Sequence, residues 1–139
     1  MTEENNLQTT EQQSENTVKI YSKRAIMGFS VFFTPVFGGV LLRQNLIDYK
    51  MKKEANTALL VSIGLTALVF IIIEIMPIST STLTLVLNII GGSVLSEYFY
   101  KKYFPNKKYE YKKIWKPLII SLIITIPLAL IAFYAIMNE

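Results

Sequence analysis

The chain of 139 residues contains no cysteine and no histidine. Without cysteine it has no disulfide framework and no thiolate metal site, and without histidine it has no imidazole base. Catalysis by a Ser-His-Asp or Cys-His arrangement is therefore excluded within this chain. The ten acidic residues are scattered along the sequence, so we expect no metal site, no cofactor and no catalytic residue.

Charged residues make up only 17% of the chain, whereas hydrophobic residues make up 52% and are concentrated in long runs. A transmembrane helix needs about 20 consecutive, mostly apolar residues. Three runs meet this length, at residues 55–77, 80–100 and 117–137, and a fourth run at 25–42 is shorter. The sequence therefore predicts an all-α integral membrane protein with four hydrophobic helical segments, three of which are transmembrane helices.

Basic residues are missing from the first 17 residues, which carry four glutamates and few large apolar side chains. Such a segment buries too little apolar surface to offset the entropy that it loses on ordering. A secretory signal peptide has the opposite pattern, with basic residues followed by an apolar core. We therefore expect residues 1–17 to be a disordered acidic tail that is retained, and residues 18–139 to form a single membrane domain.

The first apolar segment, residues 25–42, contains three residues that disturb helices: Pro35, Gly38 and Gly39. Proline removes a backbone donor and clashes with the preceding turn, and glycine is a weak helix former. As one straight helix this segment would reach about 27 Å, which only just spans the hydrocarbon core. Two interpretations stay open: a short span, or a broken segment that enters the membrane and returns to the same side.

Lysine and arginine are unevenly distributed among the segments that connect the apolar runs. Three precede the first run, four lie between the first and second runs, and seven lie between the third and fourth. Cytoplasmic loops are enriched in these residues close to membrane spans. We therefore expect a bacterial inner (plasma) membrane protein with both basic loops in the cytoplasm and the C-terminus outside. A re-entrant first segment would place all 14 basic residues on one side, whereas a crossing segment would separate three of them.

Three polar residues inside the predicted helices are candidates for function: Glu74, Asn88 and Thr66. An intramembrane acid is a functional-site hypothesis by default, but Glu74 lies near the outer end of its helix, where it can snorkel into water. Asn88 lies deeper and in line with Gly92 and Ser96, so it is either a contact between packed helices or a substrate contact. Thr66 is either a packing hydroxyl or a ligand contact.

The loop between the third and fourth runs is dense in lysine and aromatic residues. Basic clusters beside a span attract anionic lipid headgroups. The candidates for such contacts at the cytoplasmic face are Lys101, Lys102, Lys107, Lys108, Lys112 and Lys113. In a simpler interpretation these lysines only fix the topology. The chain has no separate basic module, so nucleic acid is not an expected partner.

Residues 21–55 resemble the corresponding part of a family of uncharacterised small bacterial multi-pass membrane proteins. The resemblance rests on Pro35, Gly38 and Gly39 in the first segment, followed by the pair Asn45 and Leu46 and then a basic stretch. The order of apolar runs and basic loops over most of residues 20–135 is also similar. The resemblance implies a bacterial multi-pass protein and carries over no catalytic residue.

These patterns favour a non-enzymatic membrane protein that packs against partner membrane proteins, as an accessory subunit or an immunity-type factor. The alternative is a homo-oligomeric transporter or channel whose path uses Glu74, Asn88 and the break at Pro35, Gly38 and Gly39. Three or four short helices are too few for a pore in one copy, so this alternative requires an oligomer. A lipid-acting enzyme is not favoured, because the chain shows no acid pair or nucleophile pattern.

Overall fold

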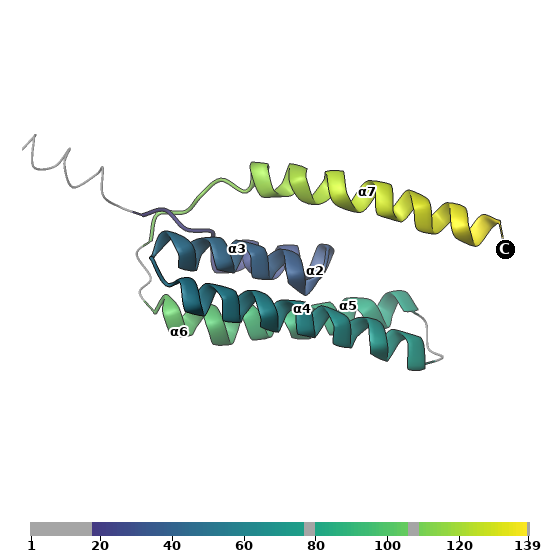
Figure 1. Ribbon diagram of the computed structural model, residues 1–139, viewed down its shortest axis with the longest axis horizontal. Coiled ribbons are helices and arrows are strands. Elements are labelled where there is room, and N and C mark those ends of the chain that lie inside the picture. The colour runs from purple at the N-terminus through teal and green to yellow at the C-terminus, as the bar shows by residue number, and fades with distance from the viewer. Residues whose placement is uncertain (1–17, 77–79, 106–108, 139) are drawn as a thin grey trace, which may run out of the picture.

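A computed structural model describes residues 18–76, 80–105 and 109–138. The predicted acidic tail, residues 1–17, lies outside the described residues. Most of the described chain is helical, and the helices run along one common long axis (Figure 1). In chain order they are α2 (Lys23–Phe32), α3 (Pro35–Asp48), α4 (Lys52–Ile75), α5 (Thr80–Ser93), the π-helix η1 (Val94–Tyr100), α6 (Lys101–Tyr103) and α7 (Trp115–Met137).

Three helices are long and apolar enough to cross a membrane: Lys52–Ile75, Ser81–Tyr103 and Trp115–Met137. The second of these joins α5, η1 and α6 into one continuous rod. They correspond to the three longer apolar runs of the sequence, so the prediction of an all-α protein with three membrane-spanning helices is confirmed. The chain is a small multi-pass membrane protein.

The first apolar segment forms a helical hairpin. Its backbone leaves the helical path at Phe33 and Thr34, and α3 starts at Pro35. Tyr21, just before α2, hydrogen-bonds to Asn45 near the end of α3, so the two helices return to a common end. The 10 residues of α2 and 14 of α3 give lengths of about 15 and 21 Å. The hairpin therefore reaches roughly half-way or a little further across a hydrocarbon core of about 30 Å. The structure therefore shows the break and the return of the chain that the second interpretation requires.

The break falls just before Pro35, whereas Gly38 and Gly39 lie inside α3. Proline suits the first position of a helix because its missing N–H would have no partner there. The glycines face neighbouring helices at very close range: a Cβ on Gly38 would overlap Ser30 of α2, and a Cβ on Gly39 would overlap Ser62 of α4. The expectation that these glycines break the helix is therefore corrected, because their small size serves close packing.

The buried core lies toward the end of the molecule where the hairpin begins. The N-terminal segment runs beside the loop before α7: Ile20 N–H donates to the Glu110 carbonyl at 3.0 Å, and Lys112 N–H donates to the Ile20 carbonyl at 2.8 Å. The largest apolar side chains with no exposure come from this segment and from α2, α3 and η1; they are Ile20, Ile26, Leu42, Leu46 and Leu95.

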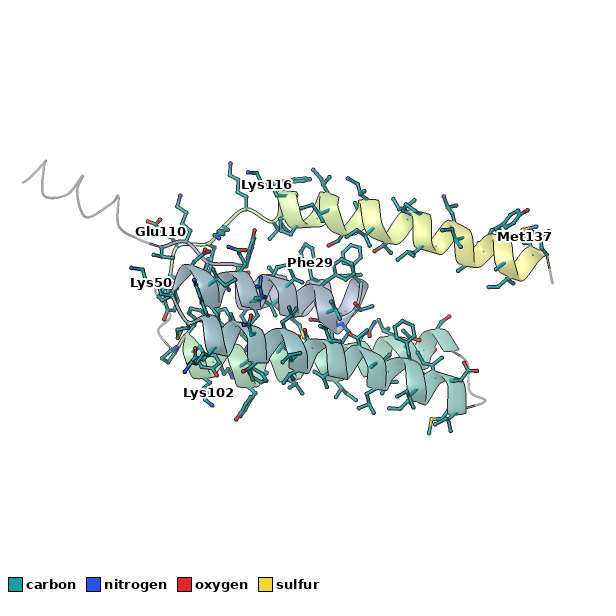
Figure 2. The ribbon with its side chains drawn as sticks, viewed as in Figure 1. Phe29, Lys50, Lys102, Glu110, Lys116 and Met137 are labelled. Carbon is teal, nitrogen blue, oxygen red and sulfur yellow. The ribbon has the colours of Figure 1, made fainter. Side chains whose placement is uncertain are left out.

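Positive charge is gathered at this same end, which we call the basic end. Figure 2 shows Lys50, Lys102 and Lys116 toward it and Met137 at the opposite end. Every lysine and arginine that the structure describes lies before or within the first turn of α2, from the last two turns of α3 to the start of α4, or between the end of η1 and the start of α7. The fold therefore leaves the far ends of the three spans without basic residues in the described chain.

The last helix stands apart from the others. α7 starts beside the hairpin, but no other helix of the described chain packs along its length (Figure 1). Its only buried residue is Ser121. The helix continues through Pro127 without interruption. By contrast, α4 and α5 both pack against the hairpin.

Candidate functional site

The tip of the α2–α3 hairpin, residues 31–36, is the candidate functional site. Here one helix ends and the next begins at a depth where the flanking spans are apolar. The last carbonyl groups of a helix and the first N–H groups of the next have no partner within their own helices. Because water is scarce in a membrane interior, other protein groups must satisfy them.

Thr66 of α4 provides a hydrogen-bond acceptor for a free backbone N–H group at the start of α3. Its hydroxyl oxygen accepts a hydrogen bond from Val36 N–H at 3.1 Å and donates one to the Ser62 carbonyl at 3.0 Å. Thr34 occupies the N-cap position, but its own side chain makes no capping bond. The threonine singled out in the sequence is therefore placed at the hairpin tip, where it caps a helix of a different segment.

Asn88 of α5 lies on the other side of the tip, next to the end of α2. Its side-chain amide donates a long hydrogen bond to the Val31 carbonyl at 3.5 Å. The residue is only 4% exposed, and its Oδ1 has no hydrogen-bond partner among the described residues. A buried, unpaired amide oxygen is energetically costly. Oδ1 therefore keeps spare capacity to accept a hydrogen bond.

Two glycines bring α5 close to the hairpin. A Cβ on Gly91 would lie 2.7 Å from Pro35 Cγ, and a Cβ on Gly92 would lie 2.8 Å from Ser30 Cβ. Ser96, one turn further on, also lies against α2. The line of Asn88, Gly92 and Ser96 that the sequence predicts on one side of the helix thus faces α2. Small residues there allow close approach between membrane helices.

The π-helix η1 contains Ser96 and continues toward the basic end. Its wider winding is uncommon, and such segments often occur at functional sites. Glu97 in η1 forms ion pairs with Lys23 of α2 and with Lys101 one turn on. The pair with Lys101 follows from their spacing of four residues, whereas the contact with Lys23 is visible only in the fold.

Glu74 is not part of the hairpin tip. It is exposed in the last turn of α4, two helical turns and about 12 Å beyond Thr66 at 1.5 Å per residue. This position fits a side chain that snorkels to the membrane surface. The structure therefore brings Thr66, Asn88 and Pro35 together and leaves Glu74 outside the group.

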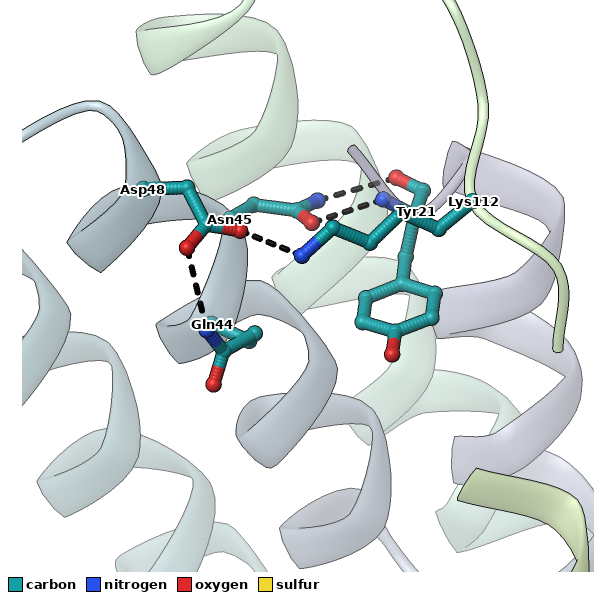
Figure 3. Close-up of polar contacts among 5 residues, drawn as sticks. All are labelled: Tyr21, Gln44, Asn45, Asp48 and Lys112. Carbon is teal, nitrogen blue, oxygen red and sulfur yellow. Dashed lines mark hydrogen bonds and ion pairs between the residues drawn. The ribbon is translucent and has the colours of Figure 1, made fainter. Parts of the chain in front are cut away.

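A second polar cluster, which we call the basic-end clip, lies where the hairpin begins (Figure 3). The buried side chain of Asn45 accepts a hydrogen bond from Tyr21 N–H at 2.7 Å and donates one to the Tyr21 carbonyl at 2.9 Å. Lys112 forms an ion pair with Asp48, and its ammonium lies 5.2 Å from the centre of the Tyr21 ring. Gln44 donates to Asp48 at 3.0 Å. The clip ties the N-terminal segment, α3 and the loop before α7 together.

Aromatic rings pack beside the basic-end clip. Tyr49 lies edge-on to Phe104 and Tyr109, with ring centres 5.2 and 6.2 Å away. Burial raises the pKa of Tyr49, and the nearby Tyr109 adds to the effect, so this phenol stays neutral at physiological pH. Sequence reasoning missed these contacts because their members are far apart in the chain and show no local pattern.

The lysines expected to contact anionic lipid have different surroundings. Lys101 and Lys112 each pair with a carboxylate, so they serve the fold. Lys102 lies over two tyrosine rings, and Lys113 is exposed. The two that lie outside the described residues are Lys107 and Lys108.

Comparisons with protein-family models, curated proteins and solved structures find no match to this chain. The resemblance to small bacterial membrane proteins therefore stays a prediction. The residues that carry it nevertheless share one property, because all of them are buried; they are Pro35, Gly38, Gly39, Asn45 and Leu46.

The chemistry of the hairpin tip is that of neutral hydrogen bonding. Its polar side chains are a hydroxyl and a carboxamide, and both bond to backbone groups at helix ends. Among the described residues, no three acidic side chains gather as a metal site would require. The arrangement holds the α2–α3 hairpin in place and leaves the Asn88 Oδ1 as a free acceptor.

Proposed function

We propose that this multi-pass membrane protein acts by packing against another integral membrane protein through α7, and that it is not an enzyme. The observation that carries the proposal is the separation of α7 from its own chain. Ser121 is the only buried residue of this helix, and no other described helix packs along it. An accessory or immunity-type role requires such a helix that is free to associate.

The residue spacing on α7 supports this proposal. Four small residues, Ser121, Thr125, Ala129 and Ala132, follow one another at intervals of four, four and three residues. They therefore share one face of the helix, which we call the small-residue face. Membrane helices associate through close packing at small residues, because lipid provides no hydrophobic driving force between them. Ser121 is buried within the chain, whereas Ala129 and Ala132 are exposed, so the C-terminal part of this face suits a transmembrane helix of the partner.

We place the protein in a bacterial inner membrane with its basic end in the cytoplasm. The clustering of all described lysines and arginines at that end supports this orientation. The C-terminal half of α7 then lies in the outer half of the bilayer, beyond the reach of the hairpin. At that depth α7 is far from the other helices of its own chain, so a partner helix can pack against it.

Photo-crosslinking in intact membranes tests the proposal. A photoreactive residue at Ala129 is expected to form one product that contains an integral membrane protein other than this chain. An added Ala132→Ile substitution is expected to abolish that product, because a larger side chain blocks the small-residue face. A photoreactive residue at the exposed Leu130, which points well away from this face, is the matched control and should yield no such product.

Two outcomes would contradict the proposal. One is a set of products from Ala129 that contain only lipid. The other is a product that contains only two copies of this chain, which would favour a homo-oligomer.

A second candidate function, a homo-oligomeric transporter or channel, is favoured by one observation at the hairpin tip. Broken membrane helices present backbone groups at their ends to polar or charged solutes, and the unpaired Oδ1 of Asn88 lies beside the end of α2. In this case Asn88→Leu should abolish solute flux into liposomes. Glu74→Gln should leave flux unchanged, since Glu74 lies outside the tip. Unchanged flux in Asn88→Leu would eliminate this function.

A further inference from the structure

An open groove runs along α2 on the side that faces α7. It has a volume of about 660 Å³ and an apolar wall made by Ala25, Gly28, Phe29 and Phe32 of α2, with Ile114 and Leu118 opposite. Ligand sites in proteins typically have volumes of about 300–1,000 Å³. The groove extends from the basic end toward the hairpin tip, because it follows α2 over its whole length.

The groove is cationic at its mouth. Arg24 lines it there, is exposed, and forms no ion pair with any residue that the structure describes. Its neighbour Lys23, by contrast, is engaged with Glu97. Lys113 and Lys116 flank the lining residue Ile114 in sequence, and both are exposed. The mouth of the groove thus presents an unpaired guanidinium.

A smaller groove of about 330 Å³ lies on the other side of α2, toward α5 and η1. The two grooves share Arg24 and Gly28 as lining residues. A Cβ at Gly28 would meet nothing within 4 Å, so no packing contact within the chain explains a glycine here. The outward face of α2 therefore has one groove on each side of Gly28, and Arg24 borders both grooves at the basic end. We call this surface the saddle.

We propose that this saddle binds one anionic phospholipid. Its phosphate pairs with the Arg24 guanidinium, whose planar fork of donors matches phosphate oxygens. One acyl chain fills the groove between α2 and α7. The smaller groove takes no acyl chain, because it is lined by polar and charged residues such as Lys23, Ser96 and Glu97. The positions agree with a bilayer, since Arg24 stands in the first turn of α2 at the basic end and the apolar walls lie deeper. The positive charge gathered at the basic end favours a headgroup with a net negative charge.

This inference goes beyond the packing role of α7 and does not depend on it. The groove is lined by the start of α7, at Ile114 and Leu118, whereas the small-residue face lies further along the helix. A bound lipid would link α7 to α2 where the two helices make no direct extended contact.

Native mass spectrometry of the full chain, released from nanodiscs, tests the site. Nanodiscs of phosphatidylglycerol mixed equally with phosphatidylcholine should leave one retained phosphatidylglycerol per chain. Arg24→Gln should lower this retention about five-fold, as expected for one lost charge at the membrane surface. Gly28→Leu should remove it by filling the saddle, and the new Cβ itself meets no atom within 4 Å.

Gly64→Leu is the matched control, because a Cβ at Gly64 of α4 also meets nothing within 4 Å. It should retain phosphatidylglycerol as the native chain does. Circular dichroism and elution volume would verify that all variants fold alike. Equal retention of the two lipids, or native retention by Gly28→Leu, would overturn the site. So would a dimer mass that Gly28→Leu abolishes, since a second copy would then fill the groove.

Discussion

Three polar side chains hydrogen-bond to backbone groups around the hairpin: the buried Asn45 and Asn88 and the half-buried Thr66. Thr66 and Asn88 bond at its tip, and Asn45 bonds at its base. Each bond satisfies a backbone group for which the membrane or the protein interior provides little water. At the scale of the residue, the polar atoms of this protein serve the backbone of a segment that is not one continuous helix.

Replacing Thr66 with valine is expected to destabilise the protein. The change preserves the shape of the side chain but leaves Val36 N–H without its acceptor. The N–H is part-buried and lies at apolar depth, so the loss should cost about 1–3 kcal/mol. The unfolding free energy, measured by SDS titration from mild detergent micelles, is the readout. Thr57→Val on the same helix removes an exposed hydroxyl and should be nearly neutral. Equal effects of the two substitutions would contradict the capping role of Thr66.

Asn45→Ala is expected to loosen the N-terminal segment. It leaves the N–H and carbonyl of Tyr21 unpaired at the base of the hairpin, and each lost partner costs about 1–3 kcal/mol if the group stays buried. Hydrogen–deuterium exchange at Ile20 and Tyr21 should become much faster. The adjacent Gln44 is exposed, so Gln44→Ala should leave this exchange slow. Unchanged protection in Asn45→Ala would show that other contacts hold the segment.

The helices of the hairpin are held by glycines placed at their contacts. Gly38 faces α2, Gly39 faces α4, and Gly91 and Gly92 of α5 face the hairpin from another side. Such close approach increases van der Waals contact, which is a main source of helix association in membranes. At the scale of the element, a short hairpin gains stability from its fit between two longer helices.

Gly39→Ala should therefore separate α3 from α4. The new Cβ would overlap the Ser62 side chain, and overpacking of this kind typically costs about 1–3 kcal/mol. Gly64→Ala on α4 meets open space and should be neutral or stabilising by up to about 1 kcal/mol through helix propensity. The same SDS titration distinguishes the two. Adding Ser62→Gly to Gly39→Ala should restore part of the loss, and a lack of any rescue would contradict this contact.

At the scale of the whole molecule, three spans and one half-depth hairpin place the charge of the protein at one end. A hairpin that returns brings Lys23 and Arg24 to the same end as the loops before α4 and α7. The ion pairs of Lys23 with Glu97 and of Lys112 with Asp48 then join segments far apart in the chain. The described basic residues thus lie at one end of the molecule because the first apolar segment folds back as a hairpin.

The sequence predicts much of this arrangement, because bilayer thickness and apolar length are strong constraints. The three spans and the break at Pro35 follow from it directly. The packing of Gly38 and Gly39 does not, since a glycine in a helix shows nothing of its neighbours until the helices are placed. Asn45 gave no local signal, because its partner Tyr21 is 24 residues away. The separation of α7 was equally hidden, since its composition is that of any transmembrane helix.

The central claim is that residues 25–42 enter the membrane and return to the same side. Cysteine labelling tests it directly, because the native chain has no cysteine. Single cysteines at Lys19, Lys50 and Met76 would be treated, in sealed vesicles of known orientation, with a maleimide that cannot cross the membrane. We expect Lys19→Cys and Lys50→Cys to be labelled from one side and Met76→Cys from the other. Labelling of Lys19→Cys from the same side as Met76→Cys would show that the first segment crosses the membrane, and would contradict the hairpin.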